Sequence, residues 1–211
     1  MATPRIFWDV DTQHDFMDVD GKLYIPDAES IKPNLKRLTD FAHERGLRIV
    51  ASADDHEPGH GELSTTPDFQ ETFPEHCMRG TPGARKIPET ALSSPLIIEP
   101  APTPVAELAR MLHVNVRDVL IRKHWFDVFS NPNTSAVLDA LAPEEIVVYG
   151  VATDVCNQYA IEGFLRRGNV RVLAVTDAMK PINTQRADAI LASWQGRGVK
   201  LVSTDSVLGG A

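Results

Sequence analysis

The fold can be predicted from one stretch, Ile146-Val147-Val148-Tyr149-Gly150-Val151-Ala152-Thr153-Asp154-Val155-Cys156. Its first residues are β-branched, apolar or aromatic, which is typical of a buried strand in a parallel sheet. Gly150 closes the apolar run, and the chain then enters a predicted helix that carries Cys156 in its first turns. Because the amides at the start of a helix favour negative charge, this position favours a thiolate on Cys156.

Other apolar strands also end in an ionisable residue. Asp11 closes a predicted strand that contains Ile6 to Val10, and Lys123 closes Val119-Leu120-Ile121-Arg122. Asp54 follows a third predicted strand directly. Because the carboxyl ends of parallel strands meet at one edge of a sheet, where ligands bind, we expect these side chains to lie together with Cys156.

Short β-rich runs alternate with amphipathic helical segments along the chain, which indicates repeated βαβ units. We predict an α/β fold with a six-stranded parallel sheet flanked by helices on both faces, a Rossmann-like arrangement of three layers. Strands are predicted near 4–11, 47–53, 117–123, 145–151, 170–175 and 199–203. Helices are predicted near 31–42, 105–112, 134–142, 153–167 and 184–197.

The segment at about 54–94 lacks a clean period and is rich in Pro, Gly, Thr and His. We predict a long ordered loop over the active site, because structureless segments of this length in compact domains usually have a function. The stretch from Pro95 to Pro100, with the helix after it, is interpreted as added material before the strand that ends in Lys123.

Length and charge restrict the class of protein. A chain of 211 residues predicts a single domain, 1–211. The net charge of -8 and the scattered 21 basic residues argue against a nucleic-acid partner. No apolar run reaches the roughly 20 residues of a membrane span, so we expect no membrane partner and a cytoplasmic protein. Cys77 and Cys156, the two cysteines, are expected to be reduced thiols.

Three motifs in order resemble the signatures of the isochorismatase-like cysteine hydrolases. They are Asp11-Thr12-Gln13-His14-Asp15-Phe16, the strand that ends in Lys123, and the stretch from Gly150 to Cys156. The resemblance covers nearly the whole chain. Asp54-Asp55-His56, followed by the segment from Phe73 to Ala84, is most similar to nicotinamidases.

The resemblance implies a catalytic triad of Asp11, Lys123 and Cys156. Cys156 would attack an amide carbonyl, Asp11 would take the thiol proton and later give it to ammonia, and Lys123 would hold the charged partners together. The backbone amides of Ala152 and Cys156 would stabilise the oxyanion, beside a non-prolyl cis peptide at Val151-Ala152. The activity implied is hydrolysis of nicotinamide to nicotinate and ammonia through an acyl-enzyme.

A second set of residues is suited to a divalent metal. Asp54 and His56 lie two apart at a strand end, and His76 lies across the loop, which supplies one oxygen and two imidazoles for zinc, iron or manganese. The resemblance places the fourth ligand at Glu62, while His60, four residues after His56, is the competing candidate.

The resemblance also implies how the substrate is held. In nicotinamidases the metal binds the pyridine nitrogen and positions the ring. Phe16 and Phe73 would then be ring-stacking walls, and Val151 and Ala152 would line the amide end. Val155 departs from the nicotinamidase pattern, because it gives the pocket an apolar wall where other members place different groups. The family resemblance further implies a small-molecule amide as partner and a homo-oligomer.

Simpler readings compete with each role. Cys156 could be a small buried hydrophobic residue and Lys123 a surface lysine. Asp9, two residues before Asp11 on the same strand, competes for the role of the acid and has no explanation at this stage. An N-carbamoyl compound, a maleamate-type amide or isochorismate remain alternative substrates, and a non-catalytic ligand-binding member of the fold is the alternative to an enzyme.

Overall fold

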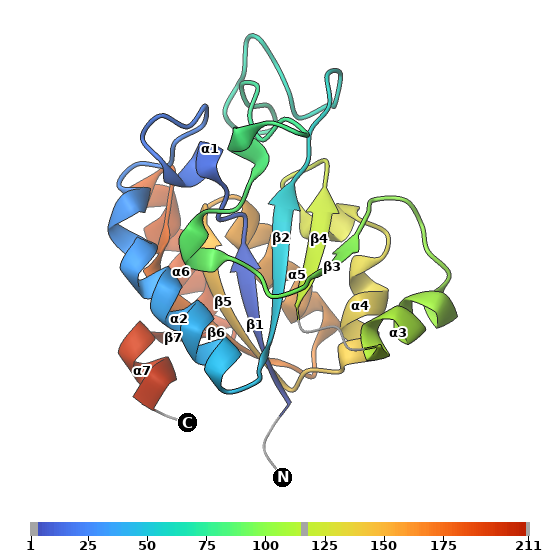
Figure 1. The fold of residues 1–211 in the computed structure, drawn as a ribbon. Helices are drawn as coiled ribbons and strands as arrows, with labels where there is room; N and C mark the ends of the chain where they lie inside the picture. The colour runs from blue at the N-terminus through green and yellow to red at the C-terminus, as the bar shows by residue number, and fades with distance from the viewer. Residues whose placement is uncertain (1–3, 115–117, 210–211) are drawn as a thin grey trace.

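The computed structural model describes residues 4–114 and 118–209 (Figure 1). The strands are β1 Arg5–Val10, β2 Arg48–Asp54, β3 Leu96–Ile98, β4 Val119–Lys123, β5 Glu145–Val151, β6 Arg171–Lys180 and β7 Lys200–Val202. The α-helices are α1 His14–Met17, α2 Lys32–Glu44, α3 Val105–His113, α4 Thr134–Leu141, α5 Cys156–Arg167, α6 Thr184–Gly196 and α7 Thr204–Gly209. Short 3-10 helices are η1 Ala28–Ile31, η2 Pro82–Ala84, η3 Pro88–Thr90 and η4 Val128–Ser130.

The strands form one parallel sheet in the order β3-β4-β2-β1-β5-β6-β7. Figure 1 shows α2 in front of this sheet and α5 behind it, so the predicted α/β architecture with helices on both faces is confirmed. The predicted strand number is wrong by one, because the described sheet has 7 strands.

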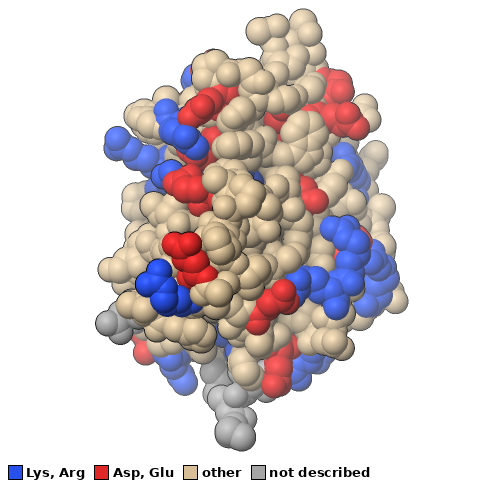
Figure 2. All heavy atoms as spheres, turned by 90° about the vertical axis from the view of Figure 1, so that its right-hand side faces the viewer, with Lys and Arg blue, Asp and Glu red and all other residues tan. Residues whose placement is uncertain are grey.

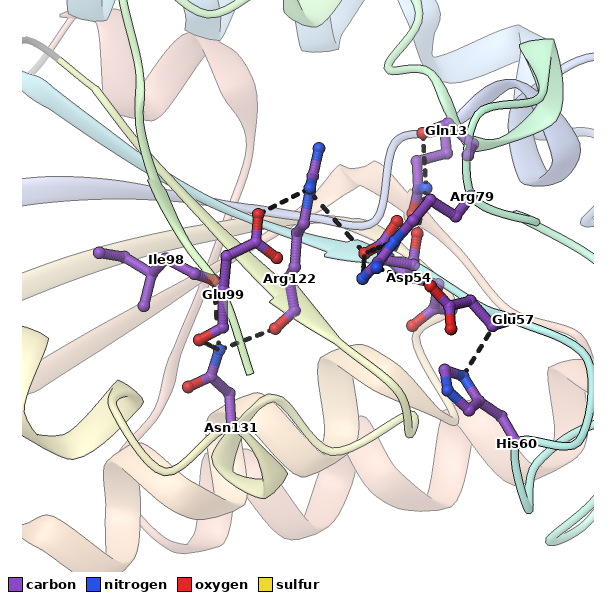
Figure 3. Close-up of polar contacts among 11 residues, drawn as sticks. Gln13, Asp54, Glu57, His60, Arg79, Ile98, Glu99, Arg122 and Asn131 are labelled. Carbon is purple, nitrogen blue, oxygen red and sulfur yellow. Dashed lines mark hydrogen bonds and ion pairs between the residues drawn. The ribbon is translucent and has the colours of Figure 1, made fainter. Parts of the chain in front are cut away.

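The additional strand is β3, in the segment interpreted from the sequence as added material. Its residues pair in parallel with β4, with Leu96 opposite Val119 and Ile98 opposite Ile121. The side-chain amide of Asn131 closes the end of this pair, donating to the carbonyls of Ile98 at 3.3 Å and Arg122 at 2.8 Å (Figure 3). A strand of three residues is too short to show a period in the sequence, which explains why it was missed.

Smaller differences concern the ends of elements. β6 continues to Lys180, past the predicted end at residue 175, and α5 begins at Cys156 instead of residue 153. The short helices α1 and α7 were not predicted. The first residue of the strand predicted at 117–123 lies outside the described residues.

The connection between strands creates a place for a ligand. From β1 the chain runs to β2 and β4 on one side, and it then returns to β5 on the other side of β1. In open parallel sheets, ligands bind at such a reversal, outside the carboxyl ends of the strands. Gly150 allows β5 to approach β1 here, since its φ is 111° and a Cβ atom would lie 2.1 Å from the carbonyl oxygen of Val10.

The long segment between β2 and β3 lies over the carboxyl edge of the sheet (Figure 1). Two buried carboxylates attach it to β1 and α1. Asp15 accepts a hydrogen bond from the backbone amide of Cys77 at 2.7 Å. Asp9 forms an ion pair with Lys86 at 2.7 Å, and Lys86 also donates to Thr12 at 2.7 Å.

These contacts explain Asp9, which the sequence left open. Its carboxylate is fully buried and faces Lys86 of the overlying segment, so it holds this segment on the sheet. Burial raises the pKa of Asp9, although Lys86 opposes the shift.

The surface in Figure 2, on the side of β3 and β4, has acidic and basic side chains interspersed. Among the residues that the structure describes, no helix has the length and apolar character needed to span a membrane.

Candidate active site

Lys123 is the centre of a buried group of charges. The register of β2 and β4 places Asp54 opposite Lys123, and the ammonium group donates a hydrogen bond to the carboxylate of Asp54. The ammonium also lies 3.0 Å from Oδ2 of Asp11 and 3.8 Å from Sγ of Cys156. The other oxygen of Asp11 accepts a hydrogen bond from Ser52 Oγ at 2.7 Å. The acid, the amine and the thiol predicted to meet at the sheet edge therefore do so.

Burial and the neighbouring charges have opposite effects on the pKa values of this group. Burial raises the pKa of the Cys156 thiol well above its usual range, and Lys123 opposes this only in part. Burial also raises the pKa of Asp11, against the effect of Lys123. Burial alone would lower the pKa of Lys123, but Asp11 and Asp54 raise it well above its usual range. Lys123 is thus a permanent cation.

The pKa of Cys156 corrects one expectation from the sequence. The position at the start of α5 suggested a resting thiolate, but the surrounding apolar walls and the two nearby carboxylates favour the neutral thiol. Any reaction of this sulfur as a nucleophile therefore requires that its proton be taken at the time of attack. Asp11 is the group within the cluster that can take it.

Next to this group, Asp54, His56, Glu62 and His76 each offer one ligand atom, and these atoms lie within 4.8 Å of one another. His76 Nε2 lies 3.6 Å from both Asp54 Oδ2 and Glu62 Oε1, and His56 Nε2 lies 4.0 Å from Glu62 Oε2. All four side chains are buried. One carboxylate, that of Asp54, therefore belongs to both groups.

The unsatisfied atoms of this cluster fit a metal ion. Within residues 4–114 and 118–209, both ring nitrogens of His56 and one oxygen each of Asp54 and Glu62 are buried without a hydrogen-bond partner. Buried polar atoms rarely lack a partner, and one ligand atom of each of the four residues lies within 4.8 Å of the others, which indicates a cation site. Nδ1 of His76 contacts the carbonyl of Pro74 at 2.7 Å, which orients the ring with Nε2 toward this site.

The two histidines have opposite pKa shifts. Burial lowers the pKa of His56 to about 4. Burial would also lower the pKa of His76, but the carboxylates of Asp54 and Glu62, each 3.6 Å from Nε2, raise it to about 10. Without a metal, a protonated His76 therefore faces both carboxylates, of which Asp54 also accepts from Lys123.

His60, the competing candidate ligand, is not part of this cluster. Its Nδ1 accepts a hydrogen bond from the backbone amide of Glu57 at 3.1 Å (Figure 3). Its ring stacks on His124 with 4.1 Å between the centroids. The geometry thus groups Glu62, and not His60, with the other three side chains.

Gln13 has a role in the site that the sequence did not reveal. Its side-chain oxygen accepts from the amide of Asp54 at 2.7 Å, and its nitrogen donates to the carbonyl of Asp54 at 2.8 Å (Figure 3). A second bond, to the carbonyl of Ala84 at 2.8 Å, links the overlying segment. Gln13 therefore fixes the backbone of the carboxylate that both groups share. The only signal in the sequence was a large amide within the motif that begins at Asp11.

A cavity lies between these groups and the overlying segment, with about 290 Å³ of empty space that includes the open solvent at its mouth. The four residues expected to contact the substrate, Phe16, Phe73, Val151 and Ala152, all line it. The expected cis peptide is present between Val151 and Ala152. The remaining lining residues are Leu23, Ile25, Asp54, Glu62, His76, Val155, Cys156 and Ile182.

The character of this cavity is apolar around a small polar end. Leu23, Ile25 and Ile182 were not anticipated, because each comes from a loop that no motif marks. No lysine or arginine is among the lining residues of the described chain. The arrangement combines a thiol, a potential base and a potential metal site at the mouth of an apolar pocket.

This fold and site define a class of α/β protein in which a parallel sheet carries an acid, a lysine and a cysteine at its carboxyl edge. The chain belongs to the isochorismatase family, because the family model of the isochorismatase domain matches residues 9–206.

Within the family, nicotinamidases are among the similar proteins. The nicotinamidase of Escherichia coli (strain K12) is 27% identical over 207 residues, which cover 88% of this chain and 87% of the relative. The nicotinamidase/pyrazinamidase of Mycobacterium tuberculosis is 26% identical over 206 residues, which cover 92% of this chain and 95% of the relative. The structure of the pyrazinamidase of Pyrococcus horikoshii in complex with zinc superposes with a TM-score of 0.72, at 23% identity, over 95% of this chain and 99% of that chain.

Proposed function

We propose that the protein is an amidohydrolase that converts nicotinamide to nicotinate and ammonia through a cysteine acyl-enzyme. One observation carries the chemistry: Cys156 Sγ lines the apolar cavity 3.8 Å from Lys123, which is itself 3.0 Å from Asp11. The similarity to two nicotinamidases supports the choice of substrate.

In the proposed reaction, Asp11 takes the proton of Cys156 as the sulfur attacks the carbonyl carbon. Burial raises the pKa of both groups, so Asp11 is a stronger base than an exposed carboxylate. Lys123 stabilises the negative charge on either partner through the transfer. The oxyanion would form near Cys156, the first residue of α5, whose amide has no acceptor within the helix. The amide of Ala152 is the second proposed donor.

The proton on Asp11 then passes to the amide nitrogen, the C–N bond breaks, and ammonia leaves behind a thioester on Cys156. A water molecule attacks the thioester carbonyl and gives its proton to Asp11. The C–S bond breaks, Asp11 returns its proton to the sulfur, and the product leaves as nicotinic acid, which loses its proton to solvent or to ammonia to give nicotinate. Acid and base roles thus alternate on one carboxyl group.

We further propose that Asp54, His56, Glu62 and His76 hold a divalent metal, of which zinc is the first candidate. The set of two imidazoles and two carboxylates also suits iron or manganese. The zinc complex of the related pyrazinamidase supports this choice. When bound, the ion supplies a coordination position for the pyridine nitrogen, while Phe16 and Phe73 would enclose the ring.

The lining of the cavity favours a neutral amide over the alternative substrates. A maleamate-type amide, an N-carbamoyl amino acid and isochorismate all carry a carboxylate. No lysine or arginine is among the described lining residues of the cavity, and away from the proposed metal ligands the walls are apolar, so a carboxylate placed against these walls would be desolvated.

The test is ammonia release from nicotinamide by the zinc-loaded protein, with maleamate as the competing substrate. We expect turnover of nicotinamide by the parent and by Cys77→Ala, and none by Cys156→Ala, which should still bind nicotinamide. Cys77 is a matched control because it is the other buried cysteine and lies outside the cavity lining. Faster turnover of maleamate would contradict the substrate, and binding without turnover by the parent would favour a non-catalytic protein.

A further inference from the structure

Asp154 is a buried carboxylate that the proposed chemistry does not use. It lies two residues before Cys156, in the turn between β5 and α5, and is 1% exposed. Both of its oxygens accept backbone amides from a different part of the chain. Oδ1 accepts from Ile182 at 2.8 Å, and Oδ2 accepts from Asn183 at 3.0 Å.

These two bonds join the turn that precedes Cys156 to the turn between β6 and α6. A backbone bond from Thr153 to the carbonyl of Lys180, at 2.9 Å, lies beside them. Asn183 in turn caps α6, because its side-chain oxygen accepts from the amide of Arg186 at 3.0 Å. The segment between β6 and α6 is therefore fixed at its start by Thr153 and at its end by Asp154.

Ile182 is the member of this segment that lines the cavity, together with Cys156. Its position depends on the amides of residues 182 and 183, whose described acceptor is the carboxylate of Asp154. Bonds from an amide to a charged carboxylate are stronger than neutral ones. One side chain outside the cavity thus holds one of its apolar walls.

We propose that Asp154 is a positioning residue that sets the width of the substrate cavity through Ile182, and so selects amides with a small ring. The choice of nicotinamide as substrate rests on the proposed function. The position of Ile182 and its bonds to Asp154 do not. An asparagine at this position keeps only one acceptor, and its amide group then faces the N–H of residue 182 or 183, donor against donor. The segment must move away, and the wall moves with it.

The first experiment compares two substrates of the zinc-loaded enzyme, nicotinamide and 5-methylnicotinamide. The ratio of their kcat/KM values does not depend on the fraction of enzyme that is folded, so a merely destabilised variant leaves it unchanged. One methyl group in a closed apolar pocket is worth about tenfold or more. We expect Asp154→Asn and Ile182→Ala each to shift the ratio of kcat/KM values about tenfold in favour of 5-methylnicotinamide.

The matched control is Asp177→Asn. Asp177 makes a similar pair of bonds, accepting from the amide of Thr204 at 2.8 Å and its hydroxyl at 2.9 Å, but Thr204, unlike Ile182, does not line the cavity. Its replacement should leave the ratio as in the parent. In the Ile182→Ala background, Asp154→Asn should add no further shift, because the wall is already gone.

A second measurement does not require amide hydrolysis. Alkylation of Cys156 by iodoacetamide and by N-phenyliodoacetamide, followed by peptide mass analysis, reports the width of the cavity. We expect the relative rate of the bulky reagent to rise about tenfold in Asp154→Asn and Ile182→Ala, by the same steric argument. If the parent releases no ammonia, the proposed function fails while this ratio still tests the inference. The inference would be overturned if Asp154→Asn and Asp177→Asn gave equal ratios of kcat/KM and of alkylation rates. It would also be overturned if Asp154→Asn shifted these ratios equally in the parent and in the Ile182→Ala background.

Discussion

Replacing Lys123 by methionine should destabilise the protein through two carboxylates that lose their cation. Lys123 is 1% exposed and lies between Asp11, 3.0 Å away, and Asp54. At an effective dielectric constant of about 20, unit charges 3.0 Å apart attract by about 5.5 kcal/mol, of which desolvation offsets part. Removal of one partner of a buried pair costs about 3–5 kcal/mol, and we expect this loss for the metal-free protein at neutral pH.

The loss of stability in Lys123→Met should be smaller with bound metal and at lower pH. A divalent ion bound to Asp54 would compensate one of the carboxylates, so the zinc-loaded variant should lose less than the chelated one. Burial already raises the pKa of Asp11 in the folded state, and removal of Lys123, which opposes this shift, should raise it further above the unfolded value. Folding of the variant then takes up protons, so its stability rises as the pH falls, and its deficit should be smaller at pH 5 than at pH 7.

The assay is urea unfolding of the parent and the variant, followed by circular dichroism, with and without a chelator. Lys36→Met is the control, because Lys36 forms an ion pair with Asp40 at 2.6 Å but is 59% exposed. Its removal should cost less than about 1 kcal/mol. The view that one buried cation holds the group together would be refuted if Lys123→Met lost no more unfolding free energy than Lys36→Met and lost the same amount at pH 5 and pH 7.

Three further outcomes are expected. Zinc binding near pH 7 should release about one proton, because His76 has a pKa of about 10 and His56 of about 4. Calorimetry in two buffers of different ionisation enthalpy measures this release. An affinity for zinc that is independent of pH between 5 and 9 would contradict it. Gln13→Leu should weaken zinc binding about 10- to 100-fold by releasing the backbone of Asp54, and unchanged affinity in a chelator competition would disprove the role of this amide. Asp9→Leu and Lys86→Met should each cost about 3–5 kcal/mol in urea unfolding but much less when combined, and additive losses would show that the pair does not act as a unit.

The sequence was most informative where chemistry and local pattern coincide. The apolar runs that end at Asp11, Asp54 and Lys123 predicted both the strands and the edge at which their side chains meet. The parallel register then aligns Asp54 with Lys123 without further information. Glu62 could be named only through the family resemblance, since it lies in a loop without a period.

Other features depend on packing between distant segments. Ile182 and Leu23 reach the cavity from loops whose path is set by their partners elsewhere in the chain, so no local pattern marks them. The protonation of Cys156 was misjudged because the effect of a helix terminus is local, whereas burial depends on the whole fold. Asp9 was explained only when the structure placed Lys86, which is far along the chain, beside it.

The carboxylate shared by the two groups, that of Asp54, has a thermodynamic consequence. One of its oxygens accepts from Lys123, while the other faces His76 at 3.6 Å. A change of charge at the proposed metal site therefore changes the electrostatic interaction of Asp54 with Lys123. If a metal ion competes with Lys123 for this carboxylate, the lysine becomes more available to stabilise a thiolate on Cys156. Linkage is reciprocal, so a modification that traps Cys156 as an anion would tighten metal binding by the same factor. Metal supply and sulfur reactivity would then be controlled together, through a single side chain.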